Sequence, residues 1–64
     1  ADLWDKLIVG DMQNGADMMV GVLILRGDVC MRIQWSPEVY KDYDKLELSV
    51  ALADMLVNKL FGKQ

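Results

Sequence analysis

Residues 18–35 read MMVGVLILRGDVCMRIQW, and this stretch decides the fold. Residues 18–25 and 29–35 are rich in β-branched and other large apolar side chains, which favour strands. Between them lies Gly27-Asp28, and glycine readily adopts the positive φ of a tight turn. We therefore predict a β-hairpin with a two-residue loop. Its register would pair Arg26 with Val29, Ile24 with Met31, Val22 with Ile33 and Val20 with Trp35.

The two faces of this hairpin differ in composition. In the predicted register, the face that includes Trp35 is apolar except at the tip. The opposite face has apolar residues and a glycine on one strand but mostly polar residues on the other: Met19, Gly21, Leu23 and Leu25 against Cys30, Arg32 and Gln34. Such a half-apolar face needs a cover, and we expect either the N-terminal segment or a second copy of the chain to supply it.

The N-terminal segment fits two different patterns. Its apolar residues fall within one half of a helical wheel, with Asp2 placed to cap the first turn, which predicts a short helix over residues 3–12. The competing prediction is a strand over residues 7–13, because Ile8-Val9 is β-branched and Asn14-Gly15 is a strong hairpin signal.

Residues 44–61 predict one long helix that is apolar on two sides. One seam has the spacing of a core-facing stripe: Leu46, Val50, Ala53, Val57 and Leu60. A second stripe on the far side holds Leu48, Leu52 and Met55. A chain this short can scarcely cover both sides, so the second stripe predicts self-association or docking on a partner.

Two start signals precede this helix. Ser36-Pro37-Glu38 offers a capping hydroxyl followed by proline at the first helical position. Asp44 with Glu47 three residues later has the form of a capping box, and Gly62 suits the helix end. Either one helix runs over residues 37–61, or a short turn precedes a second start near Asp44.

These elements predict a single small α+β domain over residues 1–64. The first expectation is helix, hairpin and long C-terminal helix (αββα), and the alternative is a three-stranded antiparallel meander followed by a helix (βββα). A chain of 64 residues buries only about 60% of the surface that its unfolded form exposes. Its stability is therefore marginal, and small domains of this kind often gain stability by oligomerisation.

The charge of the chain is unevenly distributed. The net charge is −3, and the whole surplus lies in residues 1–25, where Lys6 is the only basic residue among four acids: Asp2, Asp5, Asp11 and Asp17. This distribution argues against direct nucleic-acid binding, which requires clustered lysine and arginine. An acidic surface of this kind also suggests a DNA mimic, whose carboxylates would occupy the basic groove of a nucleic-acid-binding protein.

The residue types required for most catalysis are missing. The sequence has no histidine, one cysteine (Cys30) and no glycine-rich phosphate loop. We therefore expect no enzyme activity, no metal, no cofactor and no small-molecule substrate. The sequence shows no basic leader followed by an apolar stretch, and no apolar run reaches the ~20 residues of a membrane span. We expect a cytoplasmic protein.

The resulting hypothesis is a non-enzymatic interaction module, a homodimeric small acidic regulator, inhibitor or assembly subunit that binds a larger protein. The acidic DNA mimic is the alternative. Aromatic residues and the two half-covered surfaces supply the expected interface residues. These are Leu48, Leu52, Met55, Trp4, Tyr43, Met19 and Leu23.

Overall fold

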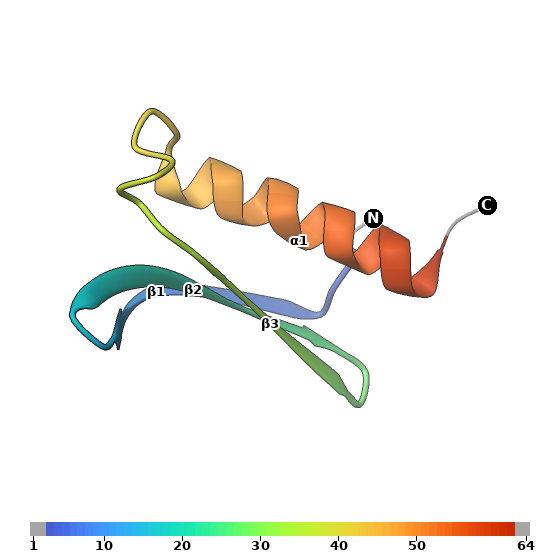
Figure 1. Ribbon diagram of the computed structural model, residues 1–64. Helices are drawn as coiled ribbons and strands as arrows, with labels where there is room; N and C mark the ends of the chain where they lie inside the picture. Colours follow the sequence, from blue (N-terminus) through green and yellow to red (C-terminus); the bar gives the residue numbers. More distant parts are fainter. Residues whose placement is uncertain (1–2, 63–64) are drawn as a thin grey trace.

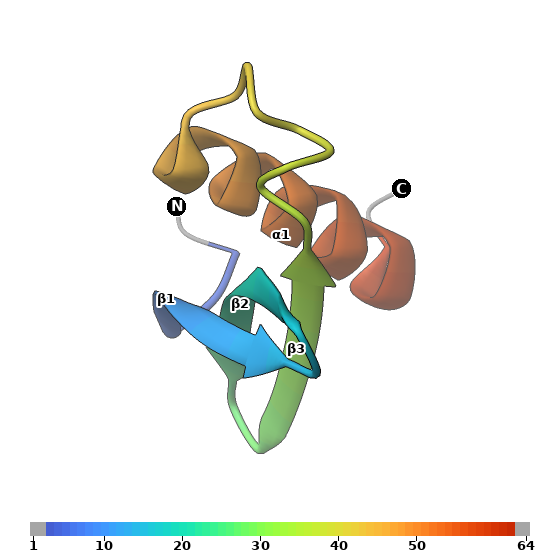
Figure 2. The ribbon, with the colours of Figure 1, turned by 60° about the vertical axis from the view of Figure 1, so that its left-hand side comes forward.

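The chain forms a three-stranded antiparallel sheet followed by one helix. The computed structural model describes residues 3–62. Strands β1 (Lys6–Asn14), β2 (Asp17–Arg26) and β3 (Val29–Trp35) pair in the order β1-β2-β3, and helix α1 (Lys45–Phe61) follows. Helix α1 lies over one face of this meander (Figures 1 and 2). No other described segment lies over the opposite face, so the fold has two layers.

The alternative βββα prediction is confirmed, and the N-terminal helix is wrong. Residues of the expected helix form β1, which pairs with β2 from Lys6 opposite Leu25 to Asn14 opposite Asp17. Pairing satisfies the backbone of a β-branched segment and directs Leu7 and Val9 toward the core, which a short isolated helix cannot match. Asp2, the expected cap, lies outside the described residues.

The N-terminal segment also does not cover the half-apolar sheet face. β1 lies beside β2 in the same sheet, and Leu3 and Trp4 pack against the hydrophobic core. Asp5 then fixes the entry into β1, because its backbone N–H donates to Leu25 O at 2.8 Å and its carboxylate accepts from Gly27 N at 2.7 Å. The N-terminal segment, which was the first of the two expected covers, therefore does not lie on this face in the described residues.

The predicted β2–β3 hairpin is confirmed pair by pair. Arg26 lies opposite Val29, Ile24 opposite Met31, Val22 opposite Ile33 and Val20 opposite Trp35. Gly27 has a φ of 57°, which an L side chain adopts only with strain. In the β1–β2 turn it is Gly15 that has the positive φ. A side-chain period of two and a two-residue loop leave the hairpin one favourable register.

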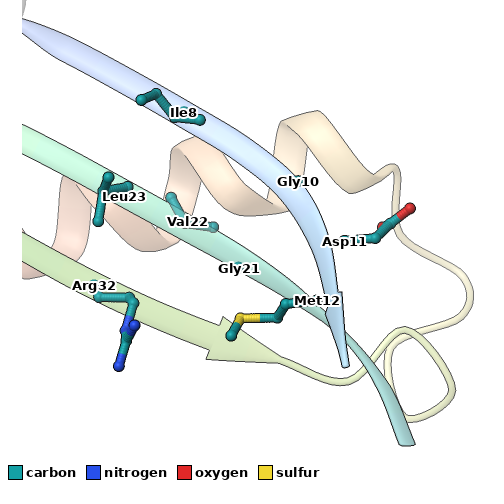
Figure 3. A pocket seen from close by; sticks show the side chains of 8 residues that line it. All are labelled: Ile8, Gly10, Asp11, Met12, Gly21, Val22, Leu23 and Arg32. Atoms are coloured by element: carbon teal, nitrogen blue, oxygen red, sulfur yellow. The ribbon is translucent and has the colours of Figure 1, made fainter. Parts of the chain in front are cut away.

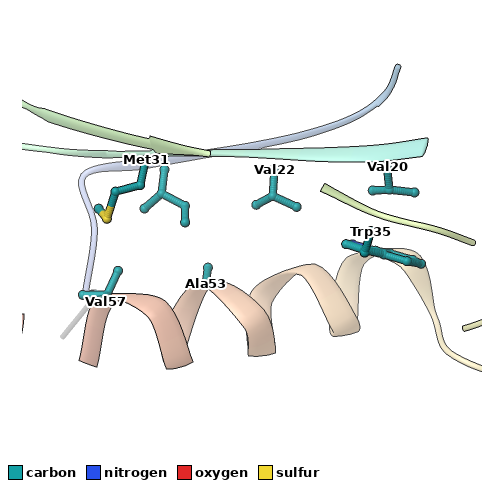
Figure 4. Packing of buried hydrophobic residues seen from close by; sticks show 7 residues of the cluster. Val20, Val22, Met31, Trp35, Ala53 and Val57 are labelled. Atoms are coloured by element: carbon teal, nitrogen blue, oxygen red, sulfur yellow. The ribbon is translucent and has the colours of Figure 1, made fainter. Parts of the chain in front are cut away.

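The core lies between β2, β3 and α1. Its buried hydrophobic residues are Val20, Val22, Ile24, Met31, Trp35, Ala53 and Val57. Figure 4 shows Val20, Val22 and Met31 pointing from the sheet toward the helix, on which Ala53 and Val57 point back toward the sheet. Trp35 brings one polar group inside, and its indole Nε1–H donates to Ser49 Oγ at 3.1 Å. Ser49 is fully buried, so this bond satisfies a donor that would otherwise be stranded.

Helix α1 begins at the second of the two predicted start signals. Asp44 caps it, with a carboxylate oxygen that accepts from Glu47 N at 3.0 Å. The first signal forms only a turn, in which Ser36 O accepts from Tyr40 N at 3.1 Å. At the other end Gly62, with a φ of 67°, donates its N–H to Asn58 O. Because Asp44 has extended backbone angles, residues 37–43 cannot continue into α1 as one helix.

The predicted core seam of the helix is correct only in its centre. Ala53 and Val57 are buried, but Leu46 is 59% exposed and Leu60 58% exposed. The end turns of α1 contact the sheet through other side chains, since Lys45 Nζ pairs with Asp11 in β1 and the Phe61 ring lies 4.1 Å from the Arg26 guanidinium in β2. Ser49 is the third buried residue of the helix. Leu48, Leu52 and Leu56 are half-buried and pack against the core from the side.

Candidate interaction surfaces

The sheet face that α1 leaves uncovered is the largest candidate site, and we call it the open face. Strand pairing sets its residues in rows across the sheet. From one end to the other these rows are Lys6, Leu25 and Cys30; Ile8, Leu23 and Arg32; Gly10, Gly21 and Gln34; Met12 and Met19; Asn14 and Asp17. Asn14 Nδ2 donates to Gln34 Oε1 at 3.4 Å, which links the two outer strands across this face.

The central strand has no polar side chain on the open face between its ends. Met19, Gly21, Leu23 and Leu25 point there, while Val20, Val22 and Ile24 point into the core. A sheet with one solvated face normally alternates apolar and polar residues, and a strand that is apolar throughout is typical of burial on both faces. β2 therefore has the sequence of a doubly covered strand, although α1 covers only one of its faces.

A shallow depression of about 260 Å³ lies near the middle of the open face. Two paired glycines, Gly10 and Gly21, form its floor, and Ile8, Leu23, Met12 and Arg32 lie around it (Figure 3). Met12 extends over Gly21, where a Cβ would come within 2.7 Å of its sulfur. Above Gly10 there is free space. The depression has the size and lining to accept one apolar side chain from outside.

Charges on the open face are separated along the strands. Lys6 lies in the first row and Arg32 in the second, whereas Asp17 lies in the last row. The face is therefore basic toward one end and acidic at the other. Two such faces attract each other when they meet with their strands reversed, because opposite charges then come together at both ends.

The expected interface residues do not form one surface. Met19 and Leu23 lie on the open face and are half-buried. Met55 is 66% exposed on α1, and Tyr43 is exposed in the segment before the helix. The remaining three, Trp4, Leu48 and Leu52, pack against the core instead of standing free. Two of the three residues of the second helix stripe, Leu48 and Leu52, therefore pack against the core, and Met55 is the exposed one.

Aromatic side chains form a short ladder at the end of β3. The Trp35 and Tyr40 rings meet edge to face with centroids 6.3 Å apart, and Tyr43 follows at 6.0 Å from Tyr40. The sequence hypothesis preferred Tyr43 to Tyr40 as an interface residue and missed Val39, and both Tyr40 and Val39 are exposed beside Trp35. Both residues follow Ser36-Pro37. Because this helix-start signal forms only a turn, the side chains after it remain exposed.

The predicted acidic surface is dispersed. Asp5 accepts from Gly27 N, and Asp11 forms an ion pair with Lys45 Nζ at 2.9 Å. Asp17 lies at the acidic end of the open face, and Asp2 lies outside the described residues. Two of the three described aspartates therefore have partners within the chain, which disfavours a DNA mimic that presents them as free phosphate analogues.

Potential metal ligands do not cluster in the part of the chain that the structure describes. Among residues 3–62, no three acidic or cysteine side chains come together as metal ligands would. Within the same residues, no helix combines the length and apolar character needed to cross a membrane. Cys30 is an exposed thiol on the open face.

Comparisons of the chain with protein-family models, with curated proteins and with solved structures each gave no match. We therefore infer function from the chemistry of the surfaces themselves.

Proposed function

We propose that the protein is a non-enzymatic interaction module that acts as a homodimer. In this proposal two open faces pack against each other, and the dimer serves as a small regulator, inhibitor or assembly subunit for a larger protein. The observation that carries the proposal is β2, which is apolar on both faces while α1 covers only one. Covering the second face removes Met12, Met19, Leu23 and Leu25 from water, which is the driving force for association.

The charges and the apolar rows of the open face support a second copy of the chain as its cover. With a two-fold axis that runs across the strands, the Lys6 end of one face meets the Asp17 end of the other, and both ends gain opposite charges. The same arrangement sets the Gly10–Gly21 row of one face opposite that of the other, and it brings Ile8 and Leu23 of one copy against Met12 and Met19 of its partner. Such reciprocal contacts are the requirement of an isologous interface.

The size of the open face sets the strength of this dimer. β1 has nine residues, so it is about 30 Å long, and three strands are about 14 Å wide, which gives a footprint of about 400 Å² per copy. Standard stable interfaces bury about 800 Å² per partner. We therefore expect a weak dimer, with a dissociation constant on the order of micromolar or higher.

Sedimentation equilibrium on two matched variants tests this interface. Leu23→Asp places a charge on the open face, and Met55→Asp makes the same change on the exposed side of α1. We expect the wild-type protein and Met55→Asp to dimerise with the same constant, and Leu23→Asp to remain monomeric. Circular dichroism of each variant checks that it folds.

Gly10→Asp is a second variant that removes no packing, since nothing lies within 4 Å of a Cβ built at Gly10. It should abolish dimerisation as Leu23→Asp does. A monomeric wild-type chain at millimolar concentration would overturn the proposal. Loss of the dimer in Met55→Asp alone would move the self-interface to α1.

A further inference from the structure

A groove at one end of the sheet is separate from the depression on the open face. It consists of two adjoining hollows of about 470 and 670 Å³, which share Met19, Ser36 and Val39 in their walls. One side of the groove is the β1–β2 turn, and the other is the segment that leads from β3 to α1. We call it the end groove.

The inner hollow of the end groove is apolar. Trp35, Tyr40, Leu48 and Leu52 line it, together with Val39. The indole N–H of Trp35 is already bonded to Ser49 and the ring is buried, so Trp35 offers no free donor to the hollow. An occupant of this part therefore needs a bulky apolar side chain, which would gain from leaving water and from contact with the exposed Tyr40 ring.

The outer hollow is acidic. Asp17 and Glu38 line it from opposite sides of the groove, and neither hollow has a lysine or arginine in its lining. Opposed carboxylates with no cation of their own favour a positively charged group between them. The apolar and acidic parts adjoin, so the two requirements apply to neighbouring groups of one occupant.

The walls of the end groove leave it open to solvent. Val39 is 70% exposed and Met18 52% exposed, and both line the outer hollow. Small-molecule sites usually enclose most of their ligand, which this groove cannot do. An open groove instead lets a polypeptide pass through with one or two side chains anchored.

We propose that the end groove binds a peptide segment of a partner protein in which a bulky apolar residue stands next to a lysine or arginine. The apolar side chain enters between Val39 and Leu52, and the cation lies between Asp17 and Glu38. This inference rests on the proposed role in protein binding and specifies the partner's chemistry. The groove shares Asp17, Met19 and Gln34 with the open face, so peptide binding is measured on the Leu23→Asp variant, whose open face is blocked, as well as on the wild-type chain.

A defined peptide probe tests the end groove. We would titrate ¹⁵N-labelled protein with the peptide Gly-Lys-Leu-Phe-Arg-Gly-Gly and record amide and indole NMR shifts. The control peptide has glutamate in place of both basic residues. We expect saturable shifts at Met18, Val39 and Tyr40 and at the Trp35 indole with the basic peptide only, weakening as salt is added.

Two matched pairs of variants locate the binding. Val39→Lys should lower the affinity by about tenfold or more, equivalent to about 1.4 kcal/mol, whereas Leu60→Lys should leave it unchanged. Both replace an exposed aliphatic residue by lysine, and Leu60 does not line the groove. Glu38→Gln should also weaken binding, whereas Asp42→Asn, with the same change in charge, should not.

The inference is overturned if the basic peptide gives no saturable shifts, if the acidic peptide binds equally, or if Val39→Lys binds as well as Leu60→Lys. Its failure is distinguishable from failure of the dimer. If the wild-type chain dimerises through the open face but Leu23→Asp gives no saturable shifts with the basic peptide, the proposed function stands and the groove is overturned. If the wild-type chain is monomeric but binds the basic peptide, the groove stands and the dimer is overturned.

Discussion

Replacing Ser49 by alanine removes only one hydroxyl group, but it should destabilise the protein measurably. The hydroxyl is the acceptor for the buried Trp35 indole, at 3.1 Å, and both side chains are enclosed between sheet and helix. Ser49→Ala leaves a buried N–H without a partner, which costs about 1–3 kcal/mol. Alanine regains about 0.5 kcal/mol through its higher helix propensity. The net loss is then about 0.5–2.5 kcal/mol.

That loss is large for this chain. At 0.05–0.15 kcal/mol per residue, 64 residues have a total stability of about 3–10 kcal/mol. With a urea dependence of about 1 kcal/mol per molar, the midpoint of unfolding should fall by about 0.5–2.5 M. The assay is urea denaturation followed by circular dichroism, at one fixed protein concentration because dimerisation shifts the equilibrium.

A double-mutant cycle separates the hydrogen bond from other effects of the substitution. In a Trp35→Phe background no indole N–H remains, so Ser49→Ala should be neutral or slightly stabilising there. An unchanged midpoint for Ser49→Ala in the wild-type chain would refute the reasoning. So would an equal loss in both backgrounds, because the cost would then not come from the stranded donor.

Three further substitutions probe local features of the fold. Asp44→Ala removes the carboxylate that caps α1 and should lower the free energy of unfolding by about 1 kcal/mol, measured by urea denaturation. Gly27→Ala imposes a side chain at a φ of 57° and should cost about 1 kcal/mol or more, seen as a lower thermal midpoint. Gly21→Ala should displace Met12, whose sulfur would lie 2.7 Å from the new Cβ, and so change the ¹³C shift of the Met12 methyl group while the fold is retained. A Met12 methyl signal identical to the wild type would contradict the close packing over Gly21.

The hairpin and the helix start could be predicted because local chemistry determines them. Gly27 allows one tight turn, and a one-residue slip would move every apolar side chain of β2 to the wrong face. Asp44 and Glu47 likewise specify the first turn of α1 without help from distant residues. Each of these signals lies within a few positions of the structure that it specifies.

The N-terminal segment could not be decided in the same way. Its apolar residues satisfy a helical wheel and also a strand, so the choice depends on β2, which has a free edge that β1 can pair with. The helix seam failed at Leu46 and Leu60 for a related reason, because the sequence of a helix does not reveal which side chains of its end turns contact the sheet. The end groove arises where two loops distant in sequence approach each other, and no periodic pattern reports such a meeting.

The central claim is that the open face packs against a second copy of itself, and intermolecular NOEs test it most directly. A sample that mixes ¹³C-labelled and unlabelled chains at millimolar concentration allows contacts between chains to be observed selectively. We predict intermolecular NOEs from the methyl groups of Met12, Met19 and Leu23, which all lie on the open face. Intermolecular NOEs confined to Met55 on α1, or none at all, would contradict the claim.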